Sequence, residues 1–531
     1  MLKLIGWLFS QHQGKYLPIK LFKPVATGLS IFILVAQLVS ACAVGPASDN
    51  AANNTVAQAT QSPTDIAPTS TTVRPLYQPG QLVDYTVQMG DTIPALAAHF
   101  NTTADQIMAN NPIIPANVTT LPPGMPMKIP IYYQPLWGTS YKTIPDSLFV
   151  NGPAQVGFNT AQFVDSQPGW LKNDKEAADG GILMNGGELV QYVADNYSIS
   201  PRLILAILEY QTGALSQPNN PDPGNLYPLG YTDTMHQGLY NQILWAVNTL
   251  NNGYYGWRTG DLKSFDHIDG SLERPYPWQN AASVALQYYF SKTLNADDYT
   301  QATQSGGIAK TYQHLFGDPW ANVQPHIPGS LQQPPLNLPF LPGQYWAFTG
   351  APHTGWGTGE PFAAIDLAPP SAVTSCNPSA LWARAMADGV VARTDTGLVE
   401  LDLDGDGDIR TGWVLLYLHI ATDGSAKVGQ YLKVGDPVGH PSCEGGEATG
   451  AHVHIARLYN GEWISASGPL ALNLEGWITQ SDGIAYQGTM VRYSQSIRAC
   501  TCSDKSSQVE ADLANEVNPP DPAALNENSG N

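Results

Sequence analysis

The sequence predicts a multidomain protein with a small βααβ module, a mainly helical middle domain and a C-terminal antiparallel all-β domain. Three observations support this fold class. A chain of 531 residues is too long for one ordinary hydrophobic core. The 50 glycines and 43 prolines, with 13% charged residues, indicate a folded protein rich in loops and turns. The apolar pattern also changes along the chain, from a short mixed segment to helical periods and then to short strands between glycines.

The charge balance limits the range of partners. The formal net charge is -20 at pH 7, and no basic cluster occurs in the segments that are expected to fold. Nucleic acids and anionic lipid surfaces attract proteins mainly through Lys and Arg. No nucleic acid is therefore expected as a partner, and electrostatic adhesion to a membrane is not expected either.

Residues 1–41 have the pattern of an export signal. Four lysines and no acidic residue precede the apolar run VATGLSIFILVAQLVSAC, and this order is typical of secretory signal peptides. A transmembrane anchor is the alternative, but the run is short for a span and contains Gly, Ser and Gln. Its end, VSAC, resembles the lipobox of bacterial lipoproteins. This implies lipid chains on Cys42 that anchor the mature chain on the outer side of the bacterial cell membrane or envelope.

Two segments have no apolar periodicity and are expected to be disordered. Residues 42–82 are rich in Ala, Ser, Thr, Asn, Gln and Pro, which is typical of a tether. Residues 503–531 contain six acids, one Lys and no aromatic residue, which predicts an acidic disordered tail.

Residues 83–131 predict the βααβ module. A short strand in DYTVQ precedes a turn, two helices follow around IPALAAHF and QIM, and MKIP closes the segment as a strand. The start YTVQMGDT, Asn110 after the second helix and the end GMPMKIP resemble the LysM module. This resemblance implies binding to the N-acetylglucosamine-containing glycan of peptidoglycan or chitin. A small spacer of helices and strands is the alternative.

Residues 137–338 predict a mainly helical domain. In SISPRLILAILEYQTGAL, Ser200 is a candidate cap, Pro201 the first helical residue and Gly213 the stop. This helix resembles the one that carries the catalytic Glu in soluble lytic transglycosylases and goose-type lysozymes, but Gln211 stands in place of that Glu. An amide cannot protonate a leaving glycosidic oxygen. A degenerate lysozyme-like domain that holds glycan is therefore expected, with a helical domain of unrelated origin as the alternative.

Residues 340–495 predict an antiparallel β domain. Short β-branched and aromatic runs such as TGWVLLYLHIA and YLKVGDPVGH alternate with glycines. Five of the 11 histidines of the chain fall between positions 353 and 454. Residues two apart in a strand share one face, so His452 and His454 are expected to project toward one spot.

Three further residues of this domain could join that pair. His353 and Asp366 flank a glycine-rich segment, and His419 stands alone on an apolar strand. Separate strands of one sheet could bring all five side chains together. Two His and one Asp with an open fourth position form a suitable catalytic zinc site, whereas calcium would require oxygen ligands.

The order of these motifs resembles that of the lysostaphin and LytM family of zinc metallopeptidases, which cut peptide bonds of the bacterial cell wall. The segments DGVV, YLH and VGQYLKVGDPVG followed by TGAHVH carry the resemblance. It implies that His353, Asp366 and His454 bind zinc. It also implies that His452 and His419 are an unliganded catalytic pair.

One spacing departs from the family pattern, which otherwise covers about residues 345–470. The first His and the Asp of the family are four residues apart, whereas His353 and Asp366 are 13 apart (353 to 366). The segment TGWGTGEPF would then loop out between them, at a small entropic cost. His440 is the substitute ligand if His353 does not bind.

An acidic run raises the question of a calcium site. The string DLDGDGD, Asp402–Asp408, is similar to the start of an EF-hand loop, but Trp413 stands where the bidentate Glu would be. A solvated hairpin turn between two strands is the preferred interpretation, and calcium binding is the alternative.

The four remaining cysteines could form two disulfides in an exported protein. A bond between Cys500 and Cys502 would be strained, so each is expected to pair elsewhere, or one is expected to stay free; the pairing of Cys376, Cys443, Cys500 and Cys502 is left open. A metal site built on these cysteines is less favoured.

The function expected from these features is that of a membrane-anchored zinc metalloendopeptidase acting on peptidoglycan. The alternative is a non-catalytic peptidoglycan-binding lipoprotein that recruits or activates another wall hydrolase. A third possibility, glycan cleavage by the helical domain, is weakened by Gln211.

Overall fold

The computed structural model describes residues 76–370, 375–502 and 504–512, which all lie in one compact unit, Arg74–Asn531. The predicted signal peptide, Cys42 and most of the predicted tether lie outside the described residues. Within the described part of the chain, no helix has both the length and the apolar character needed to cross a membrane.

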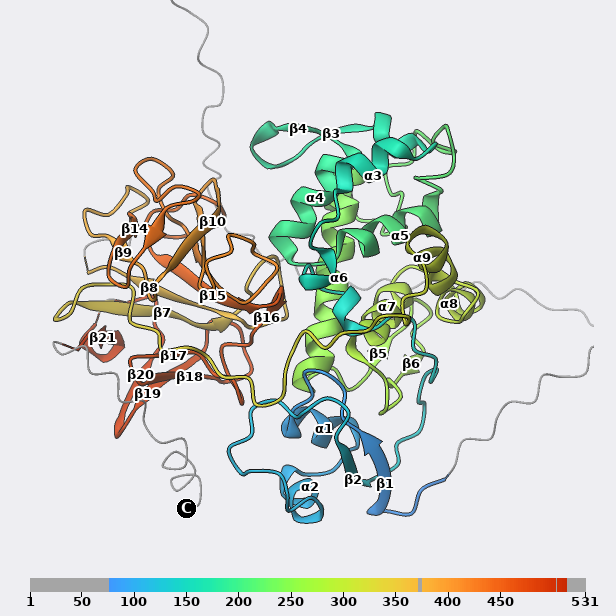
Figure 1. The fold of residues 1–531 in the computed structure, drawn as a ribbon, viewed down its shortest axis with the longest axis horizontal. Coiled ribbons are helices and arrows are strands. Elements are labelled where there is room, and N and C mark those ends of the chain that lie inside the picture. Colours follow the sequence, from blue (N-terminus) through green and yellow to red (C-terminus); the bar gives the residue numbers. More distant parts are fainter. Residues whose placement is uncertain (1–75, 371–374, 503, 513–531) are drawn as a thin grey trace, which may run out of the picture. The chain divides into compact units, whose positions relative to one another are not determined.

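The N-terminal module has the predicted βααβ order (Figure 1). Its elements are β1 (Gln81–Thr86), α1 (Ile93–His99), α2 (Ala104–Asn110) and β2 (Pro126–Ile131). The two strands pair antiparallel, and the side chains of Thr92 and Thr103 cap the two helices. Asn111 rather than Asn110 ties the second helix to β2, because its side-chain amide contacts the backbone of both Ile107 and Lys128.

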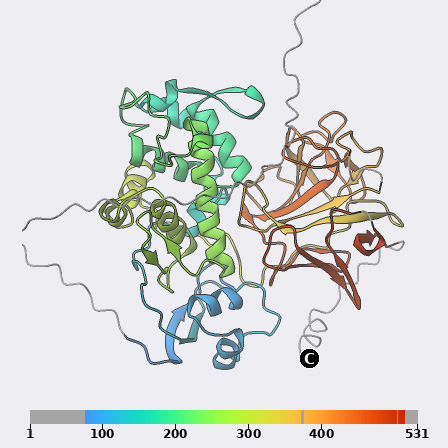
Figure 2. The ribbon, with the colours of Figure 1, turned by 180° about the vertical axis from the view of Figure 1, so that it is seen from behind.

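The middle domain is mainly helical, as predicted. Its α-helices in the described region are α3 (Thr160–Ser166), α4 (Gly186–Tyr197), α5 (Pro201–Thr212), α6 (Leu239–Thr259), α7 (Ala281–Ser291), α8 (Ala296–Ala302) and α9 (Ile308–Phe316). Two short hairpins accompany them, β3 (Lys175–Ala177) with β4 (Leu183–Asn185) and β5 (Phe265–Asp266) with β6 (Leu272–Glu273). The 21-residue helix α6 runs through this domain (Figure 2).

The predicted boundaries of α5 are confirmed. The Ser200 side chain accepts a hydrogen bond from the backbone of Leu203, Pro201 opens the helix, and Gly213 ends it with a φ of 63°. Glycine adopts this left-handed conformation without the steric cost that a Cβ atom would bring.

The C-terminal domain is built from antiparallel sheets, as predicted. The main sheet has the order β13-β10-β11-β12-β15-β8-β7-β21, with β16 paired to β15, and a second sheet has the order β17-β18-β19-β20. The strands are β7 (Tyr345–His353), β8 (Ala364–Ala368), β9 (Ala383–Arg384), β10 (Gly389–Asp395), β11 (Leu398–Asp402), β12 (Trp413–Leu418), β13 (Tyr431–Leu432), β14 (Pro437–Gly439), β15 (Val453–Tyr459), β16 (Glu462–Trp463), β17 (Asn473–Leu474), β18 (Trp477–Ser481), β19 (Gly488–Arg492), β20 (Gln495–Arg498) and β21 (Gln508–Glu510).

The two faces of the main sheet pack against different partners. In β12, Leu415 and Tyr417 belong to the core of the β domain itself. Leu416 and Leu418 point to the other face and belong to the core that contains α4, α5 and α6. Because side chains alternate along a strand, the helical domain covers one face of the sheet while the β domain fills the other.

Two predictions about the C-terminal region are wrong. The predicted acidic tail begins too early, because residues 508–510 form β21 and pair with β7 at the edge of the main sheet. The structure joins Cys376 to Cys443 and Cys500 to Cys502. The Cα atoms of Cys500 and Cys502 are 5.0 Å apart, which lies within the usual span of a disulfide.

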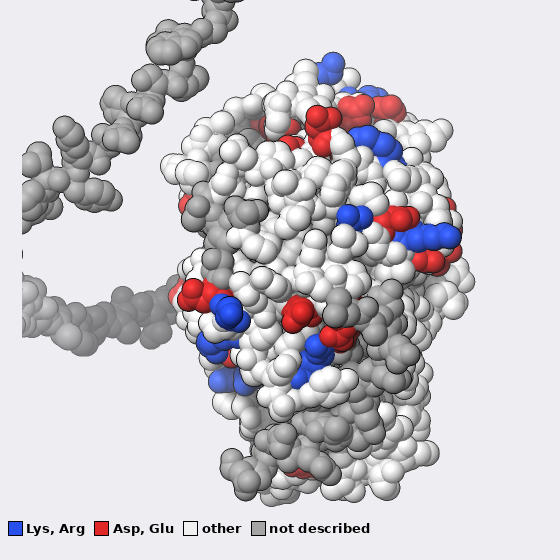
Figure 3. All heavy atoms as spheres, turned by 90° about the vertical axis from the view of Figure 1, so that its left-hand side faces the viewer, with Lys and Arg blue, Asp and Glu red and all other residues white. Residues whose placement is uncertain are grey.

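Charged side chains are sparse on the face shown in Figure 3, where basic and acidic groups lie beside one another in small clusters. One exposed ion pair of the described chain joins Arg498 Nη2 to Asp482 Oδ2 at 2.6 Å, with side chains 61% and 41% exposed.

A buried ionic junction ties the three domains together. Arg258, at the end of α6, contacts the carboxylates of Glu462 and Asp146 at 3.1 and 3.4 Å, and it donates a hydrogen bond to the carbonyl of Met89 in the βααβ module. His326 Nε2 contacts the Glu462 carboxylate at 2.6 Å. The side chains of Arg258, Glu462, Asp146 and His326 are at most 9% exposed. Each charge therefore depends on the others for compensation.

We predict that Arg258→Met destabilises the protein strongly. The change leaves two buried carboxylates without their cation, so the free energy of unfolding in urea should fall by about 3–5 kcal/mol. Arg498→Met is the matched control, and its loss should stay below about 1 kcal/mol because its ion pair is exposed. Equal losses in the two variants would contradict the importance of the junction.

The junction also predicts a loss of stability in acid. Burial alone would raise the pKa of Glu462, but Arg258 and His326 outweigh it and lower the pKa to about 2 from the usual 4.5. A carboxyl with a depressed pKa stabilises the fold fully above pH 4.5 and loses this contribution, about 3 kcal/mol, as the pH falls toward 2. Unfolding of the wild type between pH 6 and 2 should therefore depend more steeply on pH than that of Glu462→Gln. If the free energy of unfolding fell equally steeply with pH in the two proteins, the stabilising role of the ionised Glu462 would be disproved.

Candidate metal and catalytic site

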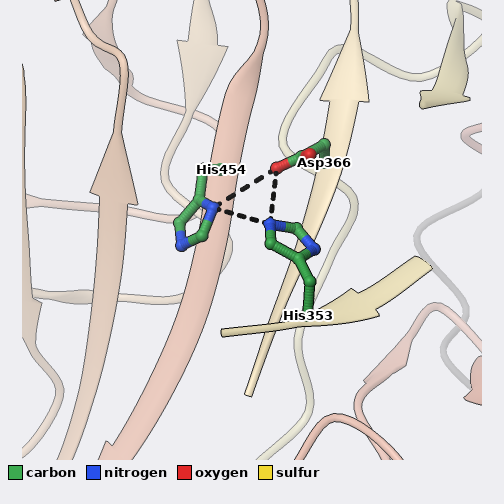
Figure 4. A group of neighbouring side chains, drawn as sticks. All are labelled: His353, Asp366 and His454. Atoms are coloured by element: carbon green, nitrogen blue, oxygen red, sulfur yellow. Dashed lines mark hydrogen bonds and ion pairs between the residues drawn. The ribbon is translucent and has the colours of Figure 1, made fainter. Parts of the chain in front are cut away.

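Three side chains from adjacent strands converge in the β domain (Figure 4). His353 ends β7, Asp366 lies in β8 and His454 lies in β15. β8 pairs with both neighbours, and Asp366 lies directly opposite His454 in the register. His353 Nε2 and His454 Nδ1 are 3.0 Å apart, and each lies 3.3 Å from Asp366 Oδ1. The structure thus brings together the three residues that the sequence assigned to the metal.

Backbone carbonyls determine which ring nitrogen faces this cluster. His353 Nδ1 donates to the carbonyl of Ala351 at 2.8 Å, and His454 Nε2 donates to that of Gly355 at 3.2 Å. A carbonyl oxygen only accepts, so these nitrogens carry the protons, and the opposite nitrogens present lone pairs to the cluster. Two lone pairs that are 3.0 Å apart repel each other unless a cation lies between them.

Asp366 completes a set of donors that fits a small divalent cation. It is buried, and its Oδ1 accepts no hydrogen bond from the described residues. Ligands at about 2.1 Å from a tetrahedral ion lie about 3.4 Å apart, close to the observed spacing. Two nitrogens and one oxygen suit zinc better than calcium.

His419 and His452 lie beside the cluster. His419 Nδ1 donates to the carbonyl of Glu444 at 2.9 Å, and His452 Nδ1 donates to that of Gly450 at 2.8 Å. Nε2 of each ring is therefore left with a lone pair. The two ring centroids are 4.5 Å apart, and His452 Nε2 lies 3.5 Å from Asp366 Oδ1.

The environments of these two histidines push their pKa values in opposite directions. Burial, helped by His452 and His454, lowers the pKa of His419 to about 3, so this ring is neutral at pH 7. Burial also disfavours protonation of His452, but the Asp366 carboxylate can accept a hydrogen bond from the protonated ring and attracts its charge, which outweighs burial and raises the pKa of His452. One ring is kept neutral, and the other is suited to take up a proton.

The five side chains line a cavity of about 760 Å³. Small residues at 448–451 form part of its wall, and Glu447 and Tyr486 form another part. The Tyr486 ring stacks on His353 with centroids 4.1 Å apart, and 53% of Tyr486 is exposed. Glu447 and Tyr486 were not predicted from the sequence. Neither lies in a histidine motif, and Tyr486 reaches the cavity from the hairpin between β18 and β19, so no local pattern signalled it.

The unusual spacing between His353 and Asp366 is accommodated by a loop, residues 354–363, that joins the paired strands β7 and β8. His440, the possible substitute for His353, lies away from the cluster. Its ring packs on Trp382, with centroids 3.8 Å apart.

The acidic run forms the predicted hairpin turn between the paired strands β11 and β12. The carboxylates of Asp402, Asp404 and Asp406 offer oxygens within 4.8 Å of one another. Asp402 is buried, which raises its pKa to about 6, and it accepts hydrogen bonds from the backbone of Gly405 and Gly407. These bonds give Asp402 a role in shaping the turn. Calcium binding at residues 402–408 stays the alternative.

Comparison with known families matches two segments of the chain. Residues 85–130 match the LysM domain, and residues 142–330 match the family described as LasA, N-terminal domain. The middle domain thus has a family match of its own, and its likeness to lysozymes stays a prediction.

Two kinds of curated protein are similar to this chain. Protease LasA of Pseudomonas aeruginosa is 28% identical over 303 residues, which cover 54% of this chain and 69% of LasA. Beta-lytic metalloendopeptidase of Achromobacter lyticus is 27% identical over 165 residues, which cover 30% of this chain and 41% of that protein.

Solved structures also resemble part of the chain. Pseudoalterin, described as an M23 metalloprotease from the deep sea, is 22% identical, with a TM-score of 0.25 over 32% of this chain and 96% of its own. The catalytic domain of lysostaphin from Staphylococcus simulans is 18% identical, with a TM-score of 0.17 over 23% of this chain and 87% of its own.

The donor set predicts about one tightly held zinc ion per chain. His353→Ala removes one of three ligands, so purified variant protein should lose this zinc when metal content is measured by mass spectrometry. His440→Ala is the matched control and should keep it. Zinc that survives His353→Ala and disappears with His440→Ala would show that the ligand set is wrong.

Proposed function

We propose that this chain, a LysM-bearing relative of the lysostaphin and LytM type of metallopeptidase, is a zinc metalloendopeptidase that hydrolyses stem or cross-link peptides of peptidoglycan. The observation that carries the proposal is the convergence of His353, Asp366 and His454 beside two further histidines with free nitrogens. The reaction class is supported by the curated relatives, which are named a protease and a metalloendopeptidase.

His353 Nε2, Asp366 Oδ1 and His454 Nδ1 would hold the zinc. When bound, zinc lowers the pKa of water toward about 7 and polarises a carbonyl oxygen. His452 Nε2 would accept a proton from the attacking water, because Asp366 favours the protonated ring. The same nitrogen would then return the proton to the leaving amine.

His419 would have a different role. Its low pKa keeps the ring neutral, and its Nδ1 proton is held by the carbonyl of Glu444. Nε2 can therefore only accept a hydrogen bond at pH 7, so it would orient the water by accepting a hydrogen bond from it, without taking up the proton. A neutral acceptor does not stabilise an oxyanion.

The other parts of the chain would bring the site to its substrate. The LysM module at residues 85–130 would bind the glycan of peptidoglycan. Lipid chains on Cys42, outside the described residues, would hold the protein on the outer side of the bacterial membrane or envelope. Both tethers would raise the effective concentration of wall peptide near the site.

A non-catalytic peptidoglycan-binding lipoprotein that recruits another hydrolase is the alternative. A non-catalytic scaffold needs no complete set of metal ligands. It also does not need His419 and His452 to have their Nδ1 atoms hydrogen-bonded to backbone carbonyls, which leaves Nε2 of each ring free. The residues of the β domain therefore favour the enzyme.

The helical domain offers little support for glycan cleavage. Gln211 accepts a hydrogen bond from the hydroxyl of Tyr289 at 2.6 Å and donates one to the carbonyl of Leu229 at 3.3 Å. The nearby Glu209 accepts hydrogen bonds from the backbone of Leu215 and Ser216, so it shapes the turn after α5. Neither residue is a free general acid.

We predict that His452→Ala keeps the zinc but loses peptide turnover. Removal of the proton acceptor should slow hydrolysis by about 10²–10⁴-fold. The measurement is the release of free amines from cross-linked peptidoglycan, with zinc content measured on the same sample. Glu209→Gln, in the helical domain, is the control and should leave amine release unchanged. Reducing or anhydro sugar ends in place of amines would support glycan cleavage, and full turnover by His452→Ala would refute the role given to this ring.

A further inference from the structure

The loop at residues 354–363 rests on helix α6 of the helical domain. The Thr358 amide donates to Asn248 Oδ1 at 2.7 Å, and Asn248 Nδ2 donates to the Thr358 hydroxyl at 2.9 Å. The Glu360 amide donates to Asn252 Oδ1 at 2.6 Å, and Asn252 Nδ2 donates to the Thr358 carbonyl at 3.2 Å. The two asparagines are one helical turn apart. Each asparagine contacts the loop through both its Oδ1 and its Nδ2 atom.

Two glycines permit this close approach. Gly357 and Gly359 have φ values of 79° and 85°. A Cβ atom at Gly357 would lie 2.5 Å from Asn248 Oδ1, and one at Gly359 would lie 2.0 Å from Asn252 Oδ1. A side chain at either position would therefore push the loop away from α6.

The same loop contacts the candidate metal ligands. It begins directly after His353 and leads into the strand of Asp366. The Gly355 carbonyl accepts the hydrogen bond from His454 Nε2. The Gly355 amide donates to the carbonyl of Pro361 at 3.1 Å, which ties together the two limbs of the loop. A displacement at residues 358–360 would therefore reach the carbonyl that orients His454.

We propose that Asn248 and Asn252 are positioning residues of the metal site. By holding the loop against α6, they keep the Gly355 carbonyl where it fixes the tautomer and orientation of the His454 ring. This inference rests on the metal centre of the proposed function. It extends that function, because residues of the helical domain would then help to position a metal ligand of the β domain. Neither asparagine touches a ligand, so the effect passes through the loop.

The test is the affinity of the metal site for zinc. The full chain is stripped of metal, and zinc is titrated in competition with a chromophoric chelator. In the double variant Asn248→Ala/Asn252→Ala, the dissociation constant for zinc should rise about 10–100-fold, the usual effect of losing support behind a ligand. The circular dichroism and thermal unfolding of the metal-free form should stay close to those of the wild type. Unchanged zinc affinity in the folded double variant would overturn the proposal.

Asn241→Ala is the matched control. Asn241 lies on the same helix, and its side-chain amide donates to the carbonyl of Gln237 at the start of that helix. This variant should bind zinc as tightly as the wild type. An equal loss of zinc affinity in Asn241→Ala would overturn the proposal, because the effect would then belong to the helix as a whole.

A variant on the loop side keeps the proposal testable if the double variant does not fold. Gly359→Ala places its Cβ against the Asn252 side chain, so this variant should also weaken zinc binding. The loss should be smaller when Asn252 is already replaced by Ala, because the clashing side chain is then absent. Gly424→Ala is the control, because Gly424 has a φ of 80° and open space around its Cβ position. Wild-type zinc affinity in Gly359→Ala would contradict the role of the loop.

Peptide turnover measured in parallel separates this inference from the proposed function. A wild type that binds zinc without cutting wall peptides would contradict the proposed function, while the loss of zinc affinity in the double variant would still support the positioning role. A wild type that cuts peptides, together with unchanged affinity in the double variant, would contradict the positioning role alone.

Discussion

The site depends on one register between two antiparallel strands. Asp366 on β8 lies directly opposite His454 on β15, and this pairing sets the distance between a carboxylate and an imidazole before any metal is considered. A slip of one residue would turn either side chain to the opposite face of the sheet. His353 then enters from the neighbouring strand, and backbone carbonyls orient both rings. The ligand geometry is thus a property of the backbone.

The candidate site and the helical domain share one face of the sheet. His454 alternates with Val453 and Ile455, which face the core of the β domain, and it lies on the same face as Ala456, which packs against the helical domain. The residues that line the cavity all come from the C-terminal domain, between positions 349 and 501. The asparagines of α6 extend this contact to the loop between two ligands, so the two domains meet next to the site.

Much of the fold and of the candidate site could be predicted from the sequence, because these features follow from local patterns of residues. The alternation of His452 and His454 indicated one strand face, and the matches to the LysM domain and to LasA confirm the resemblances to LysM and to this type of metallopeptidase. Contacts between distant segments left no such pattern. Packing in three dimensions determines three such features: the contact of Tyr486 with His353, the contact of loop 354–363 with α6, and the pairing of residues 508–510 with β7. The pairing of Cys500 with Cys502 was misjudged because the chain bends at residues 501–502, and this brings the two Cα atoms to 5.0 Å.

Three atoms, one from each of His353, Asp366 and His454, should bind one metal ion. The most direct test is a crystal structure of the purified protein with anomalous diffraction recorded on both sides of the zinc absorption edge. One zinc-specific peak is expected about 2.0–2.2 Å from His353 Nε2, Asp366 Oδ1 and His454 Nδ1. A peak bound instead by His419 and His452, or no peak within reach of these three atoms, would contradict it.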